Sequence, residues 1–538
     1  MNAMEHGCAS GIRRDGSLVG RDGCAGTRGE RRGWVQRRGA RAVGLIVALG
    51  LAFATPPTLS AQAGSWDEFD AYVRRAVSDW RAPGLAIAVV KDGDLVFARG
   101  YGVQVAGGDA AVDERTRFAI GSTTKAMTVA ALGILVDEGR LAWDDPVRRF
   151  LPWFELKDPW VTREVTVRDL LTHRAGLGNA DYLWYERDAS TEDIVRKLRF
   201  VEPAYSMRAS FIYQNIMYAA AGLVVEAVSG MPWEAFVRAR IFRPLGMEGT
   251  VPLLRELEGQ ENVAAPHALI NDTLRVIENA SVDPVAPAGA VWSSVYDMSL
   301  WLRMLLAGGV ASDGERLLES ATVEEFFRPQ TLIPAGQFYP TQRLTRPAWM
   351  SYGLAWFQHD YRGHKVDFHT GSIDGMVAVA GLVRDLNLGV YVLANRDHVE
   401  VRHALMYRVF DRYLGGEPRD WSAELKVLYD SIAAEGKKAR EAALARRVEG
   451  THPAHELDAY VGSYASDLYG VLKITRDGDG LRADWGPGMK GTLTHWNFET
   501  FRITWDARWR GSELVTFLTG TDGGVEAARL GRMLLSAR

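Results

Sequence analysis

The chain has little cysteine. Its 538 residues include only two, Cys8 and Cys24, and both precede an apolar run near the N-terminus. If the N-terminal segment is removed, the remaining chain has no cysteine, which excludes a disulfide framework, a thiol nucleophile and a thiolate metal site. The 11 histidines include no His-x-x-x-His pair, and the carboxylates form no paired metal-ligand pattern. The sequence therefore predicts neither a metal nor another cofactor.

An excess of positive charge is also missing. The first 63 residues carry nine arginines and four acidic residues, so the rest of the chain has 54 basic and 63 acidic residues and a net charge of −9. This balance disfavours binding to phosphate backbones and anionic lipid headgroups. We therefore expect no nucleic-acid partner, and no membrane partner once the N-terminal segment is gone.

The first 63 residues have the pattern of a signal peptide. Five arginines between positions 31 and 41 precede the thirteen-residue apolar run 42–54, and small residues follow up to Ala63. A basic region, a short apolar region and a small-residue cleavage site are typical of export, and the apolar run is too short to span a bilayer comfortably. We predict a signal peptide over 1–63 and a periplasmic or extracellular protein. An uncleaved membrane anchor is the alternative.

Strand patterns occur at both ends of the region that follows. Residues 84–90 and 95–102 are apolar runs joined by an Asp-Gly turn, and strand patterns return at 352–357 and continue to about residue 393. Between them, residues from about 140 to 290 have mostly helical spacing. The sequence predicts a sheet built from both ends of the region, with a helical insertion between them.

The C-terminal part has a different character. Residues 421–447 are charged and rich in alanine, which predicts a solvated linker helix within 417–452. From Leu457 onward, short alternating segments are separated by Asp-Gly turns and contain many aromatic residues. This pattern predicts a separate small all-β, barrel-like domain over 453–538, in which the aromatic residues form the core.

The stretch 118–127 places a hydroxyl and an amine one helical turn apart. Ser122 and Lys125 form the only S-x-x-K in a chain with ten lysines. If a helix begins at Ser122, positions i and i+3 lie about 5–6 Å apart on one face. The apolar run that follows indicates a buried helix, and burial lowers a lysine pKa toward neutrality, so Lys125 can accept the serine proton. A serine N-cap followed by a solvated lysine is the alternative interpretation.

Two further motifs follow in order, Y-Q-N at 213–215 and H-T-G-S at 369–372. Together with S-x-x-K they resemble the three-part signature of the penicillin-recognising serine hydrolases, which include class C β-lactamases, D,D-carboxypeptidases, D-aminopeptidases and related esterases. The resemblance implies an α/β (α+β) β-lactamase/transpeptidase-like fold over 64–416, with an antiparallel sheet flanked by helices and an inserted all-helical region. The C-terminal domain resembles the lipocalin-like barrel of some members.

The resemblance also implies a role for each matching residue. Ser122 attacks an acyl carbon to give an acyl-enzyme, and Lys125 takes its proton. Tyr213 moves a proton to the leaving group or activates the deacylating water, while Asn215 orients Lys125 or the substrate amide, or simply caps its helix. Backbone N–H groups of Ser122 and Ser372 form the oxyanion hole. The other members of the predicted site are His369, Thr370 and Gly371.

His369 stands where β-lactamases have a lysine that binds a substrate carboxylate. A histidine, with a reference pKa of about 6.5, is cationic only part of the time near neutral pH and can act as a hydrogen-bond donor or an acid/base. This departure favours peptidase, amidase or esterase activity over β-lactamase activity. His173, in the segment Leu-Leu-Thr-His, we interpret as structural.

These observations predict an exported serine hydrolase that acts on a small peptide, amide or ester substrate, including D-amino-acid peptides. A β-lactamase and a non-catalytic penicillin-binding or scaffold protein are the alternatives. We expect the loops 180–210 and 325–350 to form the pocket walls. The sequence leaves homo-oligomerisation open.

Overall fold

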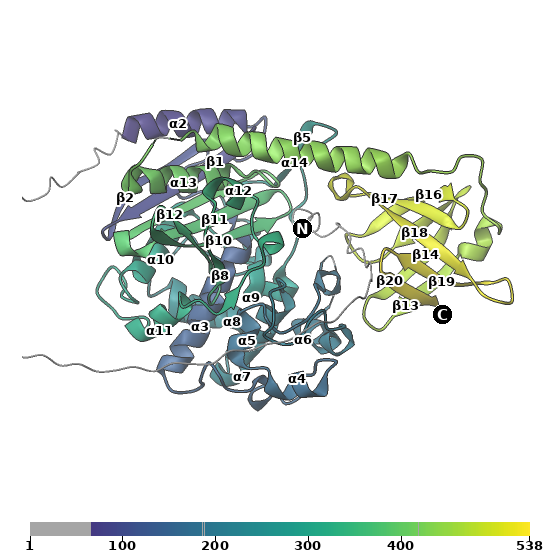
Figure 1. Ribbon diagram of the computed structural model, residues 1–538, viewed down its shortest axis with the longest axis horizontal. Helices are drawn as coiled ribbons and strands as arrows, with labels where there is room; N and C mark the ends of the chain where they lie inside the picture. Colours follow the sequence, from purple (N-terminus) through teal and green to yellow (C-terminus); the bar gives the residue numbers. More distant parts are fainter. Residues whose placement is uncertain (1–65, 186, 188, 418) are drawn as a thin grey trace, which may run out of the picture. The chain divides into compact units, whose positions relative to one another are not determined.

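The computed structural model describes residues 66–185, 187, 189–417 and 419–538 (Figure 1). The predicted signal peptide, 1–63, lies outside these residues and stays a prediction. Within the described chain no single helix is both long and apolar enough to cross a bilayer. One bent pair, Ile216–Ser229 with Trp233–Phe242, reaches that length and composition only when the two helices are taken together.

An eight-stranded antiparallel sheet forms the centre of the larger region, in the order β2-β1-β12-β11-β10-β9-β8-β7. Strands from the two ends of the region meet in it, because β1 pairs with β12 and Leu85 lies opposite Ala394. The prediction of a sheet built from both ends is confirmed. The strands are β1 (Gly84–Lys91), β2 (Asp94–Gly102), β7 (Thr331–Leu332), β8 (Met350–Tyr352), β9 (Phe357–Tyr361), β10 (His364–Ile373), β11 (Met376–Val383) and β12 (Leu388–Ala394).

The prediction of a strand at 352–357 is wrong, because the chain turns between these two positions. β8 ends at Tyr352 and β9 begins at Phe357, and these two residues pair with each other. Ala355 between them has a φ of 66°, a left-handed value, and the Gly353 N–H donates to the Trp356 carbonyl oxygen at 2.8 Å. An apolar run does not reveal such a turn, since both the strand ends and the turn are buried.

Both faces of the sheet are covered by helices. Leu85, Ile87 and Val89 of β1 pack in one apolar cluster with residues of α2, α13 and α14, whereas Ala86 and Ala88 pack in a second cluster with α3 and α10. Figure 1 shows α2, α13 and α14 on one side of the sheet and α3 and α10 on the other. Two buried faces explain why the central strands β1, β11 and β12 are apolar almost throughout instead of alternating. The helices are α2 (Trp66–Asp79), α3 (Lys125–Asp137), α10 (Val295–Leu306), α13 (Val401–Leu414) and α14 (Trp421–Leu444).

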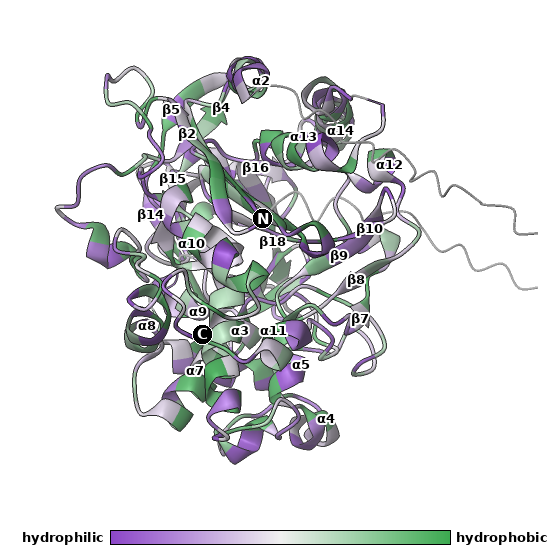
Figure 2. Ribbon diagram, turned by 90° about the vertical axis from the view of Figure 1, so that its left-hand side faces the viewer, coloured by the Kyte–Doolittle hydropathy of each residue, from purple (hydrophilic) through white to green (hydrophobic). Residues whose placement is uncertain are grey.

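Most regular elements of the insertion between α3 and α10 are helices, as predicted. Its longest helix, α7 (Ile216–Ser229), is mainly apolar (Figure 2) and ends at Gly230, whose left-handed φ of 77° closes it. The shorter helices of the region are α4 (Pro159–Glu164), α5 (Val167–Leu171), α6 (Thr191–Arg196), α8 (Trp233–Val237), α9 (Ala286–Gly289), α11 (Ser320–Phe326) and α12 (Gln342–Thr345), the last two lying after α10.

The insertion is not all helical, however, and this part of the prediction is corrected. Strands β4 (His267–Ile270) and β5 (Thr273–Val276) form a hairpin inside it. The two residues between them, Asn271 and Asp272, have φ values of 51° and 60°. A two-residue hairpin turn requires such positive values, and Asn and Asp tolerate them best after glycine. A second small pair joins β3 (Phe118–Ala119) to β6 (Trp292–Ser293).

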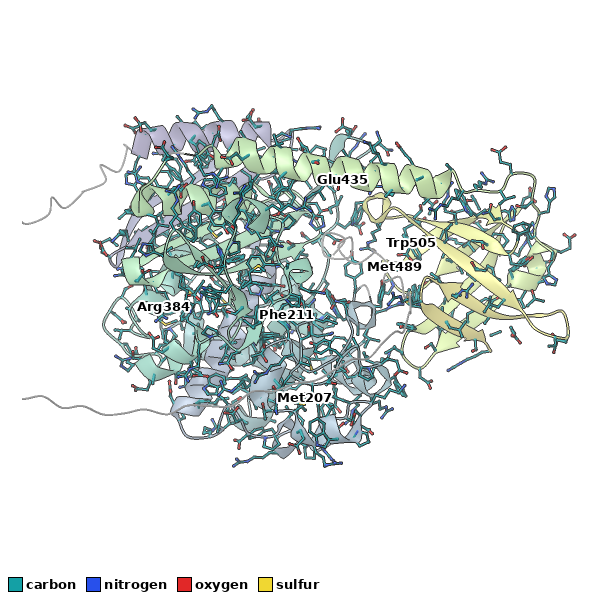
Figure 3. The ribbon with its side chains drawn as sticks, in the orientation of Figure 1. Met207, Phe211, Arg384, Glu435, Met489 and Trp505 are labelled. Carbon is teal, nitrogen blue, oxygen red and sulfur yellow. The ribbon has the colours of Figure 1, made fainter. Side chains whose placement is uncertain are left out.

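The C-terminal region is a closed barrel of eight strands in sequence order. Trp485, Phe501 and Trp505 are buried in its interior, and Figure 3 labels Trp505, so most of the aromatic residues form the core as predicted. Closure leaves no free strand edge. The strands are β13 (Gly462–Ser466), β14 (Gly470–Asp477), β15 (Gly480–Asp484), β16 (Lys490–Asn497), β17 (Thr500–Trp505), β18 (Ser512–Thr519), β19 (Val525–Leu530) and β20 (Met533–Ala537).

Candidate active site

Ser122 lies on a short 3-10 turn, Gly121–Thr124, that runs directly into α3. The helix begins at Lys125, three residues later than predicted, but the Lys125 Nζ still lies 2.9 Å from the Ser122 Oγ. The helix is buried continuously from Lys125 to Leu135, as its apolar pattern predicted. The sequence spacing therefore places the amine against the hydroxyl inside the protein.

The Lys125 amine is enclosed by hydrogen-bond acceptors and an aromatic ring face. Its Nζ donates to the Asn215 Oδ1 and to the Ala288 carbonyl oxygen, each at 2.7 Å, and lies 4.8 Å from the centre of the Tyr213 ring. Burial lowers the pKa of Lys125 well below its ordinary value, and the negative charge of Asp181 partly opposes this effect. In its neutral form the amine has two N–H groups and one lone pair. When the two acceptors take the N–H groups, the lone pair of this form faces the Ser122 hydroxyl and can accept its proton.

Asn215 contacts Lys125 and does not cap its helix. Asn215 immediately precedes α7, but its side chain makes no capping hydrogen bond. Its Oδ1 accepts from Lys125, and its Nδ2 donates to the Asp181 Oδ1 at 3.0 Å. Each end of the amide therefore has one protein partner, while its second lone pair and second N–H remain for a substrate, and Asn215 lines the pocket.

The Tyr213 hydroxyl is buried beside Ser122 and has no hydrogen-bond partner among the described residues. Burial raises the pKa of Tyr213 well above its ordinary value, while the neighbouring Ser122 hydroxyl lowers it in part. The group is therefore a neutral phenol. The His173 ring packs against the Tyr213 ring with a centroid separation of 4.2 Å and holds it in place. A positioned phenol with an unused O–H can donate a proton to a leaving group.

Close backbone contact between the serine turn and β10 explains why positions 121 and 371 are glycine. A Cβ on Gly371 would lie 1.8 Å from the Ile120 carbonyl oxygen, and a Cβ on Gly121 would lie 2.7 Å from the Ser372 N. Gly121 also has a left-handed φ of 53°. The two glycines allow the backbone N–H groups of Ser122 and Ser372 to come close together, as an oxyanion hole requires.

His369 ends a chain of buried hydrogen bonds whose directions are all determined. The Gln214 backbone N–H donates to the His173 Nδ1 at 3.0 Å, so His173 carries its hydrogen on Nε2 and donates to the Tyr352 hydroxyl at 3.2 Å. Tyr352 then donates to the His369 Nε2 at 3.0 Å. The His369 Nδ1 donates to the Thr370 carbonyl oxygen at 2.6 Å. The structural interpretation of His173 agrees with this arrangement.

The expectation that His369 is partly cationic and available to a substrate is not met. Both ring nitrogens have protein partners, and burial lowers the pKa of His369 to about 3, so the ring is neutral. Thr370 is also buried, and its hydroxyl is hydrogen-bonded to Tyr339. Phe211, labelled in Figure 3, packs against the rings of His173 and Tyr352 and completes this apolar support. His369 and Thr370 therefore hold β10 in place, and Gly371 and Ser372 meet the serine turn.

Ser372 is held by an ion pair that the sequence did not reveal. The Arg402 guanidinium donates to the Ser372 Oγ at 2.9 Å and to the Gly371 carbonyl oxygen at 2.5 Å. Glu400 accepts two hydrogen bonds from the same guanidinium at 3.0 Å. Both charged groups are buried, and their pairing compensates for the loss of solvent. This pair stabilises the oxyanion-hole end of β10 from behind.

Ser122 opens into a small pocket of about 70 Å³. Trp184, Val282 and Val285 give it an apolar wall, while Asp374 and Asp397 contribute carboxylates. No lysine or arginine is among its lining residues in the described part of the chain. The pocket therefore suits a small apolar group and has no fixed cation to receive a carboxylate.

The pocket walls come only partly from the predicted loops. The loop 180–210 contributes Trp184 and Tyr185, as expected. Apart from the site residues at 121–122 and 215, the other described lining residues come from 280–289 and 372–398 and not from 325–350. The segment 325–350 instead includes Tyr339, which supports Thr370 from inside the protein. The sequence gave no sign that 280–289 and 372–398 meet in the pocket, since more than 80 positions separate these two segments.

Asp181 is another residue beside the site that the sequence reasoning missed. It lies in the loop after the Leu-Leu-Thr-His segment, 34 residues before Asn215, and no motif marks it. Within the described chain no group of three or more His, Cys, Asp or Glu side chains is arranged to hold a metal ion.

The sheet, its helical insertion and the Ser-Lys-Tyr-Asn site define a serine hydrolase of the penicillin-recognising class. The family model for β-lactamase matches residues 69–413, and the chain belongs to that family. A model for a domain of unknown function, DUF3471, matches residues 446–535, which include the barrel.

Similar proteins include hydrolases and penicillin-binding proteins. The chain is 30% identical over 440 residues to unguisins hydrolase ungD of Aspergillus violaceofuscus, covering 76% of each chain. It is 30% identical over 335 residues to penicillin-binding protein 4 of Amycolatopsis lactamdurans, covering 59% of this chain and 82% of the relative. Among solved structures, the octameric penicillin-binding protein homologue from Pyrococcus abyssi has a TM-score of 0.58 at 21% identity, covering 88% of this chain and 99% of the other. That likeness supports the fold.

Proposed function

We propose that this protein hydrolyses a peptide, amide or ester bond through an acyl-enzyme on Ser122. The observation that carries the proposal is the arrangement of Lys125, whose two N–H groups are taken by Asn215 and Ala288 and whose lone pair faces the Ser122 hydroxyl. Few structural roles would require a buried, neutral amine beside a serine at the bottom of a pocket.

The acylation step follows from these positions. Lys125 accepts the proton of the Ser122 hydroxyl as the Oγ attacks the acyl carbon, and the negative charge on the former carbonyl oxygen is stabilised by the backbone N–H groups of Ser122 and Ser372. When the bond to the leaving group breaks, Tyr213 gives its proton to the leaving nitrogen or oxygen and regains one from the Lys125 ammonium. In net terms one proton has moved from Ser122 to the leaving group, and Lys125 and Tyr213 are back in their starting states.

Deacylation repeats the same steps with water. Lys125, neutral again, accepts a proton from a water molecule through or beside Tyr213 while the water oxygen attacks the acyl carbon. The bond between the acyl carbon and Ser122 Oγ then breaks, and the proton returns to the serine. The products are a carboxylic acid and the free enzyme.

Amide and peptide substrates, including those with D-amino acids, are favoured over β-lactams. A relative that is 30% identical is named for the hydrolysis of unguisins. In addition, the pocket is lined by Asp374 and Asp397, whereas the neutral His369 ring is held inside the protein. A β-lactam carboxylate would meet these carboxylates in a pocket whose described lining residues include no lysine or arginine.

The proposal is tested by labelling and turnover. The protein without residues 1–63 is treated with a fluorescent phosphonate and assayed on esters, amides, D-amino-acid peptides and nitrocefin, with Ser122→Ala as the blank. We expect labelling and turnover that Ser122→Ala abolishes. Labelling that persists in Ser122→Ala would disprove an acyl-Ser122 mechanism, and efficient nitrocefin turnover would favour the β-lactamase alternative. Inactivity of the wild type on the whole panel, together with capture of a partner protein, would favour a binding or scaffold role.

We also propose that the protein is exported and that it forms homo-oligomers. The N-terminal pattern motivates the first part, and the octameric homologue from Pyrococcus abyssi motivates the second. N-terminal sequencing of the protein from the extracytoplasmic fraction tests cleavage near Ala63. Light scattering after size exclusion tests the second part, and a monomer at all concentrations would contradict it.

A further inference from the structure

Asp181 is a buried carboxylate that contacts the catalytic amide but belongs to none of the family's motifs in this sequence. It is 3% exposed and lies in the short turn Asp181–Leu183. Its Oδ1 accepts hydrogen bonds from the Asn215 Nδ2 at 3.0 Å and from the Trp184 indole at 2.8 Å. Its Oδ2 accepts one from the Asn179 Nδ2 at 3.0 Å. Three donors therefore converge on one carboxylate immediately behind the site.

The orientation of the Asn215 amide depends on this carboxylate. The oxygen and nitrogen ends of an asparagine amide are almost equal in shape, so the neighbouring groups decide which end faces which way. An ionised carboxylate can only accept hydrogen bonds, so it selects the NH₂ end of Asn215. The oxygen end is then left for Lys125. If the amide were reversed, its NH₂ group would face the amine and compete with Ser122 for the lone pair.

We propose that Asp181 is a positioning residue that sets the orientation of Asn215, so that the Lys125 lone pair is directed at Ser122, and that ties this arrangement to the pocket wall through Trp184. The inference rests on the proposed function, because it concerns the same base. It adds a residue that acts on the reaction only through its neighbours.

The charge of Asp181 gives the proposal an independent signature. His173 and His369 near Lys125 are neutral because burial lowers the pKa of each, and Tyr213 and Tyr218 are neutral phenols because burial raises theirs. Asp181 is the charged group that raises the pKa of Lys125 against the effect of burial. Removing its charge should therefore lower the pKa of Lys125, and the acid limb of the kcat/KM profile should move to lower pH.

Two variants separate the charge of Asp181 from its role as an acceptor. Asp181→Asn keeps an acceptor oxygen and removes the charge, so we expect the acid limb to move to lower pH with a decrease in kcat of less than about tenfold. Asp181→Leu removes both the charge and the acceptor oxygens. We expect kcat to fall by about 100-fold with a much smaller change in KM, because Lys125 is misplaced while the pocket remains. Asp181→Glu keeps the charge and should keep the acid limb near its wild-type pH.

Asp169→Asn is the control for loss of a buried carboxylate. Asp169 is fully buried and pairs with Arg174 and Arg208, away from the groups that act on Lys125. We expect this variant to lose thermal stability without a shift of the acid limb. If Asp181→Asn and Asp181→Leu fold with wild-type kcat and an unmoved acid limb, the proposal is wrong.

A titration that needs no turnover separates the two proposals. With ¹³Cε-labelled lysine, the pKa of Lys125 is read directly by NMR, and Lys125→Met identifies its signal among the ten lysines. We expect Asp181→Asn to lower this pKa. If the wild type shows no Ser122-dependent activity but the shift is present, the proposed function fails and the link from Asp181 to Lys125 stands. If the wild type is active and the pKa is unchanged in Asp181→Asn, the positioning proposal fails.

Discussion

Two buried bases, Lys125 and His369, lie close to the same serine but differ in whether their hydrogen-bond partners leave a lone pair free. Burial lowers the pKa of both, that of Lys125 well below its ordinary value and that of His369 to about 3. Lys125 meets two acceptors, which take its N–H groups and leave its lone pair for Ser122. His369 meets one donor and one acceptor, Tyr352 and the Thr370 carbonyl, and has nothing left for a substrate. The comparison shows that burial makes a base available only when its hydrogen-bond partners leave the lone pair unoccupied.

Removing Lys125 should have the largest effect. Lys125→Ala eliminates the base and should lower kcat/KM by about 10³-fold or more, because general base catalysis and nucleophile activation are lost together. Stopped assays with the best substrate of the panel measure this loss, and circular dichroism checks folding. If a folded Lys125→Ala protein retained more than a tenth of the activity, Lys125 would not be the general base, and its comparison with His369 would fail.

A methyl group on Gly371 tests the backbone contact that brings β10 to the serine. The added Cβ would lie 1.8 Å from the Ile120 carbonyl oxygen, so the strand must move and the Ser372 N–H leaves the oxyanion hole. We expect Gly371→Ala to lower kcat by about 10²–10³-fold. Gly336→Ala is the matched control, since its Cβ would meet no atom within 4 Å and its φ is not left-handed, and it should retain wild-type activity.

Tyr213→Phe should change activity and stability in opposite directions. Removing the proton donor should lower kcat by about 10²-fold. The same change removes a buried hydroxyl that has no partner among the described residues, so the free energy of unfolding should rise by about 1 kcal/mol. Kinetics and urea unfolding measure the two effects. A loss of stability together with the loss of activity would show that the hydroxyl has a structural partner.

His369→Gln should have the smallest catalytic effect. Glutamine can accept from Tyr352 and donate to the Thr370 carbonyl, so we expect kcat to fall by less than about tenfold and the acid limb to stay in place. A large shift of the acid limb in this variant would mean that His369 titrates during catalysis, and the contrast with Lys125 would be lost.

The buried histidines also predict how stability depends on pH. Burial lowers the pKa of His359 to about 4 and those of His369 and His403 to about 3. In the unfolded chain these groups bind protons near pH 6.5, so below that pH the unfolded state holds more protons and the free energy of unfolding falls. Each histidine should contribute about 1.4 kcal/mol per pH unit between about pH 6 and 4. Thermal melts over this range should show a shallower slope for His369→Gln than for the wild type.

The sequence was sufficient to predict the elements that depend only on residues close together in the chain. The three-residue spacing of Ser122 and Lys125, the apolar run of α3 and the strand runs at both ends of the region each depend on neighbours within a few positions. The residues that complete the site depend on distant contacts. Asp181 meets Asn215 34 positions later, and Tyr352 determines the state of His369 from another strand. A motif places His369 in the right strand but does not reveal which partners its two nitrogens have.

The continuous burial of α3 has a consequence for how the protein loses activity. A helix with no solvent-facing side from Lys125 to Leu135 cannot open without exposing the centre of the region, so its amide hydrogens should exchange with solvent only when the whole region unfolds. The catalytic amine is the first residue of that helix. Hydrogen exchange in α3 and thermal inactivation should therefore follow the same transition, and the chemistry should persist until the fold itself is lost.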